Sequence, residues 1–146
     1  MNIKRILLCT ISLTLALQLQ LAHAENPKVK MDTSKGSMII ELYPEKAPLS
    51  VANFLAYANA GAYDSTIYHR VIKDFMNQGG GFTEDFTKVK TNAPTANEAI
   101  HGPKKFKYTL AMARTGVPQS HTHQFFIHTK DHATHFYKSD AADDMQ

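Results

Sequence analysis

The residues best suited to chemistry lie in one stretch, residues 68–82, which reads YHRVIKDFMNQGGGF. Arg70 carries a guanidinium that stays charged at physiological pH and can only donate hydrogen bonds. Two large apolar side chains, Phe75 and Met76, and the amide of Gln78 follow closely. A cation, an amide and apolar groups so near one another favour a surface cleft that binds and polarises a ligand. The alternative is a strand whose apolar side chains are ordinary core, followed by a glycine turn.

The motifs of covalent and phosphate chemistry are missing from the sequence. It contains no nucleophile elbow, no zincin motif and no Walker loop, and the glycine triplet at 79–81 is not followed by the Lys-Ser/Thr pair of a phosphate-binding loop. Glu84 and Asp85 are adjacent, so on a strand their carboxylates would point to opposite faces and could not act as a pair. Binding and polarisation by arginine, glutamine and aromatic side chains remain.

Histidines offer a second kind of site. Five of the eight fall between His121 and His135, at spacings that can chelate zinc, copper or nickel. No cysteine or carboxylate completes an obvious ligand set, and His123 and His128 would lie on opposite sides of a strand. We therefore predict no metal and no cofactor, and interpret these residues as solvated loop histidines. A histidine-rich metal-binding module is the alternative.

The element that would position the central stretch is a strand at residues 68–72. Alternation places Tyr68 and Arg70 on one face and His69 on the other, where we expect His69 to be a buried structural residue. The three glycines that end the stretch are expected to mark a bend or a close approach of backbones.

Upstream, residues 29–33 and 37–42 flank a Ser-Lys-Gly turn and predict an antiparallel hairpin. Pro48 opens a helix with an apolar stripe around Phe54, and Gly61 stands where a C-terminal cap is expected. This short helix should cover one end or side of a sheet.

Downstream, residues 83–107 contain repeated turn signals and predict a long irregular segment. Short strands follow at residues 108–113 and 124–127, and in the second Gln124 and Phe126 share one face. Because short strands predominate, the predicted fold class is mainly β with helices. A closed or strongly curled antiparallel sheet is favoured, since closure removes exposed edges.

The beginning of the chain has the pattern of a secretory signal peptide. A basic start is followed by an apolar run over residues 6–21 and by the small-x-small sequence AHA that ends at Ala24. We therefore predict a signal peptide at residues 1–24, a domain at residues 25–146, and a periplasmic or secreted location after cleavage near Ala24. An uncleaved membrane anchor is the alternative.

The mature chain would contain no cysteine, since Cys9 is the only one, and this excludes disulfides. Removing Lys4 and Arg5 from the 16 basic residues leaves 14 against 13 acidic ones, so the formal charge falls from +3 to +1. Such an even balance argues against a nucleic-acid or membrane-surface partner. We expect neither, and we expect a monomer.

From Val29 to about Asp131 the chain resembles the cyclophilin-type peptidyl-prolyl cis-trans isomerases, particularly the bacterial exported members. The matching runs are APLSVANFLAY, YHRVIKDFMNQGGGF, NEA at residues 97–99, TLAMART and QFFI. The resemblance implies a cyclophilin-like closed antiparallel β-barrel with an open groove on its outside. It also implies isomerisation of X–Pro bonds in proline-containing polypeptides.

Carried over position by position, the resemblance implies that Arg70 is the catalytic residue. The residues implied to bind substrate are Phe75, Met76, Gln78, Ala113, Gln124 and Phe126. The two phenylalanines and the methionine would form the proline pocket, the glutamines its polar neighbours, and the alanine the floor of the groove.

The chain departs from the family in three ways. After Ile127 the family continues through an aromatic-leucine pair, whereas residues 132–136 read HATHF, so Phe136 would have to substitute. No tryptophan is present, which argues against strong binding of the family's cyclic-peptide inhibitor. The chain also stops at Gln146, before the family's C-terminal strands and second helix. We therefore expect an incomplete barrel, either a piece of a longer reading frame or a truncated product that folds poorly.

The leading hypothesis is thus an exported isomerase, or rotamase, that assists the folding of exported proteins. A non-catalytic proline-peptide-binding chaperone that uses the same groove is the first alternative, and an inactive truncated fragment is another. The histidine-rich metal-binding module is the third.

Overall fold

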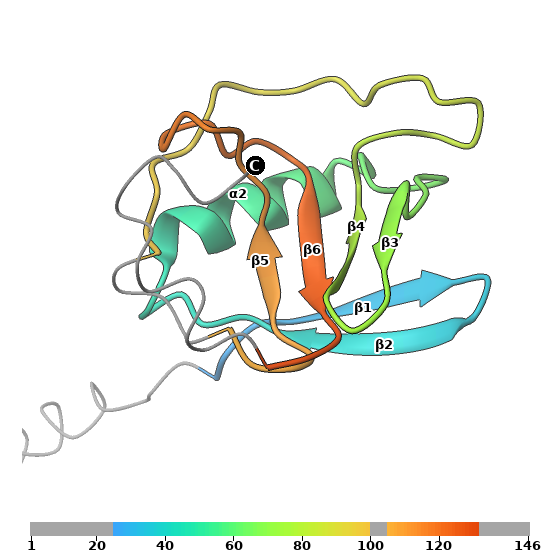
Figure 1. Cartoon of the computed structure of the whole chain (residues 1–146). Helices are drawn as coiled ribbons and strands as arrows, with labels where there is room; N and C mark the ends of the chain where they lie inside the picture. Colours follow the sequence, from blue (N-terminus) through green and yellow to red (C-terminus); the bar gives the residue numbers. More distant parts are fainter. Residues whose placement is uncertain (1–24, 100–104, 132–146) are drawn as a thin grey trace, which may run out of the picture.

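The computed structural model describes residues 25–99 and 105–131, which are mainly β with one helix, as predicted. The strands are β1 (Lys28–Thr33), β2 (Gly36–Glu41), β3 (Arg70–Ile72), β4 (Met76–Gly79), β5 (Leu110–Met112) and β6 (Phe125–His128), and the helix is α2 (Pro48–Asn59) (Figure 1). β1 and β2 pair as a two-stranded antiparallel sheet. The other four strands form an antiparallel sheet in the order β3-β4-β6-β5.

The predicted signal peptide at residues 1–24 lies outside the described residues. So does Phe136, the expected substitute for the family's aromatic residue. Within residues 25–99 and 105–131, no helix is long and apolar enough to cross a membrane.

The first hairpin is confirmed, with β1 and β2 paired from Lys28–Glu41 at its base to Thr33–Gly36 at its turn. Gly36 adopts a φ of +124°, which L side chains rarely reach, and its carbonyl oxygen accepts a hydrogen bond from the Thr33 hydroxyl at 2.8 Å. A glycine is therefore required at this position of the turn.

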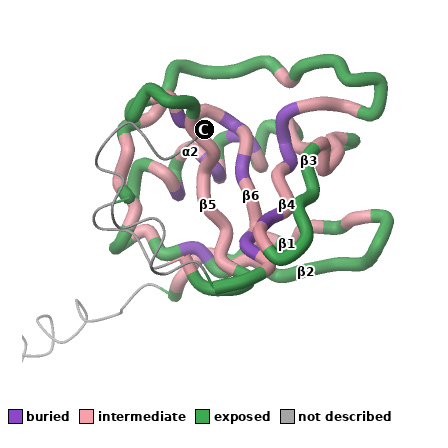
Figure 2. Tube along the Cα trace, viewed as in Figure 1, coloured by how far each residue is buried: buried purple, intermediate pink, exposed green. Residues whose placement is uncertain are grey.

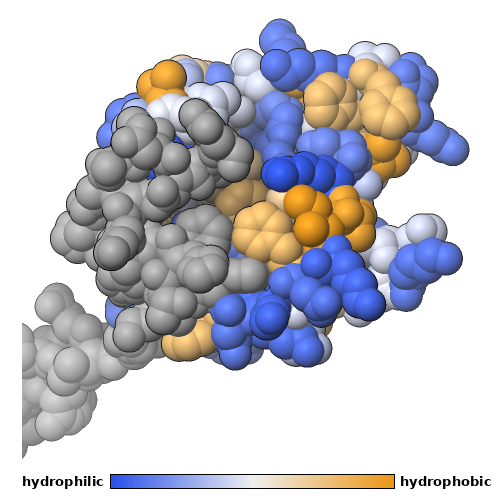
Figure 3. Space-filling view, viewed as in Figure 1, coloured by the Kyte–Doolittle hydropathy of each residue, from blue (hydrophilic) through white to orange (hydrophobic). Residues whose placement is uncertain are grey.

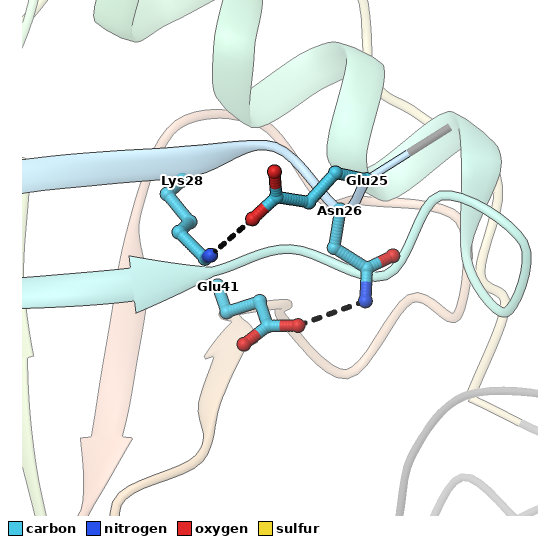
Figure 4. Close-up of polar contacts among 4 residues, drawn as sticks. All are labelled: Glu25, Asn26, Lys28 and Glu41. Atoms are coloured by element: carbon cyan, nitrogen blue, oxygen red, sulfur yellow. Dashed lines mark hydrogen bonds and ion pairs between the residues drawn. The ribbon is translucent and has the colours of Figure 1, made fainter. Parts of the chain in front are cut away.

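Surface polar contacts hold the base of that hairpin (Figure 4). The amide nitrogen of Asn26 donates to a carboxylate oxygen of Glu41 at 2.8 Å, and the Lys28 ammonium lies 2.6 Å from a carboxylate oxygen of Glu25. Glu25, Lys28 and Glu41 are exposed and Asn26 is half-buried, so each contact contributes little to stability.

Helix α2 begins and ends as the sequence indicated. Pro48 is its first residue, and the side chain that satisfies the free N–H groups of the first turn comes from far along the chain. One carboxylate oxygen of Glu98 accepts from the Leu49 N–H at 3.1 Å, and the other accepts from the Ser50 N–H at 2.8 Å. Beyond the C-terminus, Gly61 takes a left-handed φ of +66°, as expected for a helix-ending glycine.

The core lies between α2 and one face of the four-stranded sheet, where Figure 2 shows buried stretches on both. Phe54, only 2% exposed, stands edge-on to Phe125 of β6, with ring centroids 5.9 Å apart. Leu42 and Val51 complete the fully buried apolar cluster. Tyr57, also 2% exposed, belongs to the buried face of α2, although the apolar pattern of the sequence did not single it out.

The strand predicted to start at Tyr68 is wrong at its beginning, because β3 starts at Arg70. Tyr68 turns into the core: its ring stands edge-on to Phe125 with centroids 6.2 Å apart, and its hydroxyl donates to the sulfur of Met31 at 3.2 Å. Tyr68 and Arg70 therefore do not share a face. Alternation holds only where a ladder of paired residues fixes the backbone, and Tyr68 precedes the first pair of β3.

The later elements agree with the sequence except at their ends. The predicted strand over residues 108–113 is shortened to Leu110–Met112, because Tyr108 takes a φ of +70° and is 77% exposed. Where it is described, the segment predicted to be irregular contains only isolated bridges, such as Thr95 to His121.

Candidate functional site

Cross-strand pairing brings the predicted catalytic residue and part of the predicted pocket into one row. Arg70 of β3 lies opposite Gln78 of β4, and Gln78 lies opposite Phe126 of β6. Phe126 in turn lies opposite Ala111 of β5. Directly paired residues of neighbouring strands stand on the same face of a sheet, so this row occupies the face turned away from the core.

The other face confirms that assignment. Phe125 and Ile127, which alternate with Phe126 along β6, pack with Leu110 and Met112 of β5 into the core. The prediction that Phe126 and Phe125 point to opposite sides is therefore confirmed.

A chain of hydrogen bonds links the polar members of the site. The Nη1 of Arg70 donates to Oε1 of Gln78 at 3.5 Å, a long and weak bond, and Nε2 of Gln78 donates to Oε1 of Gln124 at 2.9 Å. The Arg70 side chain is exposed, and both glutamines are half-buried. Gln78 thus contacts one side of an otherwise exposed guanidinium, and Gln124 holds the Gln78 amide.

The apolar members stand beside this chain. Met76, two residues before Gln78 and on the same face, is only 2% exposed. Phe126 is half-buried and stands edge-on to the ring of His128, with centroids 5.3 Å apart. The N–H of Ala113 donates to the Gln124 carbonyl oxygen at 2.8 Å, so Ala113 continues the row past the end of β5.

Apolar side chains also reach the surface here. Figure 3 shows them gathered over β3, β4 and β6, with hydrophilic surface on either side. Val71 and Ile72 of β3 are 66% and 36% exposed. Ile72 lies two residues from Arg70 on the same face of β3, so exposed apolar surface is present on the face that carries the guanidinium, whereas Val71 points to the other face.

Phe75 lies at the edge of this arrangement and not in the row. It follows the turn that contains Asp74, which takes a φ of +57°, and it is half-buried. Its N–H donates to the Ile72 carbonyl oxygen at 3.2 Å, and its own carbonyl oxygen accepts from the Thr129 N–H at 3.0 Å. Of the seven residues predicted for the site, the sheet register pairs Arg70, Met76, Gln78 and Phe126. Phe75, Ala113 and Gln124 lie just beyond the ends of their strands.

His69 differs from the expectation of a buried structural residue. Its ring is half-buried, stands edge-on to Phe82 at a centroid distance of 4.9 Å, and hydrogen-bonds the Gln124 side chain. Burial lowers the pKa of His69 below its ordinary value, and the hydrogen bonds to Ile67 and Gln124 only partly offset this. Sequence alternation missed His69 as a neighbour of the site, because the residues before β3 do not follow the period of the strand.

The expectation of solvated loop histidines is also wrong for the three that the structure describes. His121, His123 and His128 are 7%, 1% and 0% exposed, and burial lowers the pKa values of the first two. His132 and His135 lie outside the described residues. Within the described part of the chain, no group of three or more His, Cys, Asp or Glu residues could hold a metal ion.

Comparison with known proteins identifies the family of the chain. Residues 28–141 match the model of the cyclophilin type peptidyl-prolyl cis-trans isomerase family. The chain is 54% identical over 105 residues to a peptidyl-prolyl cis-trans isomerase of Streptomyces antibioticus, covering 72% of this chain and 63% of that protein. It is 48% identical over 103 residues to peptidyl-prolyl cis-trans isomerase B of Escherichia coli K12, covering 70% and 63%.

A third bacterial relative is the peptidyl-prolyl cis-trans isomerase of Acinetobacter baylyi, 50% identical over 111 residues, covering 75% of this chain and 59% of that protein. The chain thus spans about three fifths of the length of these relatives.

The fold agrees with solved structures. A cyclophilin-type isomerase of Cryptosporidium parvum, determined in the presence of the dipeptide Ala-Pro, matches with a TM-score of 0.61 and 27% identity over 73% of this chain and 70% of that chain. A cyclophilin from Hirschia baltica matches with a TM-score of 0.62 at 23% identity, over 74% of this chain and 59% of that chain, and supports the fold alone. The two antiparallel sheets and the single described helix are therefore part of a cyclophilin barrel, and the chain belongs to the cyclophilin-type peptidyl-prolyl cis-trans isomerase family.

Proposed function

We propose that this chain catalyses cis-trans isomerisation of X–Pro bonds in polypeptides, with Arg70 as the catalytic residue. The observation that carries the proposal is the row in which Arg70, Gln78 and Phe126 stand together on the outer face of the sheet. This row puts a permanently charged hydrogen-bond donor, Arg70, on the same face as an apolar ring, Phe126. The proline ring of a substrate requires an apolar contact, and the rotating amide next to it requires a donor.

The chemistry needs no nucleophile. Rotation about a peptide bond is slow because it abolishes amide resonance, with a barrier of about 18–20 kcal/mol. As the bond twists, the proline nitrogen becomes pyramidal and regains a lone pair that can accept a hydrogen bond. A donor directed at that nitrogen favours the twisted state over both planar states, and so lowers the barrier. Arg70 can supply this donor, and its guanidinium keeps its charge.

The remaining residues of the site would hold the substrate. Phe126, Met76 and Phe75 would contact the proline ring. Ala113 would form the floor of the groove beneath the peptide. The amides of Gln78 and Gln124 would bind a substrate carbonyl and keep the guanidinium in place. With the ring held, the part of the peptide that precedes it is the part that turns.

We further propose that the chain acts on exported proteins as a monomer in the periplasm or outside the cell, with residues 1–24 as a signal peptide and residues 25–146 as the domain. The basic and apolar pattern of the first 24 residues supports this. Assisting the folding of newly exported polypeptides, as a chaperone does, would follow from that location, because X–Pro isomerisation is slow enough to limit folding.

The first test is Arg70→Ala in the full chain, assayed by the rate of cis-trans exchange in a short X–Pro peptide. Loss of the donor should reduce kcat/KM by about a hundredfold or more, in the range of removing one transition-state hydrogen-bond donor. Lys73→Ala is the matched control, since it removes an exposed cation from the same β3–β4 hairpin and should leave the rate unchanged.

The outcome also separates catalysis from binding. Wild-type rates in Arg70→Ala, with an intact circular dichroism spectrum, would refute the catalytic role. A wild-type chain that binds the peptide without accelerating exchange would instead be a proline-peptide-binding protein.

A further inference from the structure

Each of the three glycines at residues 79–81 packs against a different side chain. A Cβ at Gly79 would lie 3.0 Å from the Tyr68 ring, and one at Gly80 would lie 2.8 Å from the ring of Phe125. Gly80 also takes a left-handed φ of +75°. The first two glycines therefore make room for aromatic rings of the core, where a side chain would disturb packing.

Gly81 makes room for a polar side chain of the candidate site. A Cβ there would lie 2.6 Å from Nε2, 2.7 Å from Cδ and 2.9 Å from Cγ of Gln124. Carbon atoms do not approach so closely, so the whole Gln124 side chain beyond Cβ would have to rotate away. The Gln124 amide thus packs against the buried backbone of Gly81, in the space that a side chain at position 81 would occupy.

The backbones on both sides of this contact are held in place. The amide nitrogen of Asn53 donates to the Thr122 carbonyl oxygen, and the Tyr63 hydroxyl donates to the His123 carbonyl oxygen at 2.9 Å. These bonds anchor the two residues that precede Gln124. On the other side, the Gly81 carbonyl oxygen accepts from the Val89 N–H at 3.0 Å. A new Cβ at position 81 would therefore be accommodated by the side chain of Gln124 and not by movement of either backbone.

Gln124 is linked to Arg70 through Gln78. Its Oε1 accepts from Gln78 at 2.9 Å, and Oε1 of Gln78 accepts the bond from Arg70. Moving the Gln124 amide releases Gln78, whose own amide can then turn and leave the guanidinium without its partner.

We propose that Gly81 is a positioning residue of the active site: the absence of its side chain seats the Gln124 amide, which holds Gln78 and through it Arg70. This inference rests on the proposed function, since it says how the catalytic guanidinium is kept in place. Gly81 itself touches no substrate in this arrangement.

The test is a double-mutant cycle of Gly81→Ala and Gln124→Ala in the full chain. The φ of Gly81 lies outside the left-handed region, so alanine fits its backbone conformation, and the clash involves only a side chain that can rotate. Gly81→Ala should lower kcat/KM for a short X–Pro peptide by about fivefold to tenfold, the scale of one lost hydrogen bond, with most of the change in kcat. In the Gln124→Ala background the same substitution should cause no further loss.

Gly116→Ala is the matched control, because a Cβ there meets no atom within 4 Å, and it should leave kcat/KM unchanged. A second readout is independent of activity: the side-chain amide NMR signals of Gln78 and Gln124 should shift in Gly81→Ala and stay in place in Gly116→Ala. This readout reports on seating even if Arg70→Ala shows that the proposed function is wrong.

Equal losses from Gly81→Ala in both backgrounds would overturn the proposal, because they would indicate general backbone damage. An unchanged rate together with unchanged amide signals would overturn it as well. If Gly81→Ala does not unfold cooperatively, the double variant with Gln124→Ala decides. Cooperative unfolding of the double variant would support a clash with Gln124, and its absence would count against the proposal.

Discussion

At the scale of single residues, the candidate site changes from exposed to buried across two strands. Arg70 is exposed at the edge strand, Gln78 beside it is half-buried, and Met76 on the same face is almost wholly buried. A solvated guanidinium costs nothing to keep charged. When a peptide covers it, the loss of water strengthens its hydrogen bonds at the moment they are needed.

Phe126 should matter more for holding the substrate than for the rotation itself. Burying a side chain of this size is worth about 1.5–3 kcal/mol, so Phe126→Ala should raise KM for a proline peptide by about tenfold to a hundredfold with a smaller change in kcat. Steady-state kinetics would separate the two. Phe86→Ala removes a phenylalanine that is 68% exposed and serves as control. A fall confined to kcat would contradict this assignment.

At the scale of elements, one long-range contact holds the irregular segment to the helix. The carboxylate of Glu98 accepts hydrogen bonds from the N–H groups of Leu49 and Ser50 and from the Ser50 hydroxyl. It thus serves as the N-terminal cap that Ala47, which has no side-chain acceptor, cannot provide. A negative charge at this end is also favoured by the helix dipole.

Glu98→Ala should therefore lower the free energy of unfolding by about 0.5–2 kcal/mol, the usual effect of removing a cap. Urea unfolding followed by circular dichroism would measure it. Glu84→Ala, at an exposed position in the same irregular segment, should change the free energy of unfolding far less. Equal effects of the two substitutions would show that the cap contributes nothing specific.

At the scale of the whole molecule, three histidines link stability to pH. Burial is the first cause that lowers the pKa values of His69, His121 and His123. Positive neighbours act in the same direction on each: Arg70 on His69, Arg114 and Lys105 on His121, and Lys88 on His123. Hydrogen bonds to backbone groups act against the shift, as does the charge of Glu98 on His121.

The sign of the pH effect follows from these directions. The unfolded chain takes up protons on its histidines as the pH falls below about 6.5, whereas these three histidines of the folded chain take up protons only at a lower pH. The free energy of unfolding should therefore be greatest above the pKa of the histidines in the unfolded chain. It should decrease on acidification from pH 7.5 to pH 5.5. Chemical denaturation at the two values would show it. His123→Asn should weaken the pH dependence, and a stability that rises on acidification would contradict the account.

The sequence by itself determined the local elements and the composition of the site. Alternation identified the first hairpin and the two faces of β6, Pro48 and Gly61 marked the ends of α2, and the glycine triplet indicated a close backbone approach. These features depend on neighbours in the chain, so they can be read without knowing the fold. The resemblance to the family, which rests on whole motifs, then predicted the seven site residues.

Only the tertiary structure decided which residues meet. The pairing of Arg70 with Gln78 and Phe126, the turn of Tyr68 into the core and the burial of His123 all depend on strand register and on a helix far away in sequence. The alternation of faces fails where the pairing between strands ends. No local sequence pattern predicts which side chain will pack against a glycine. The seat of Gln124 against Gly81 is such a case, because two backbones 43 positions apart must first be brought together by the sheet.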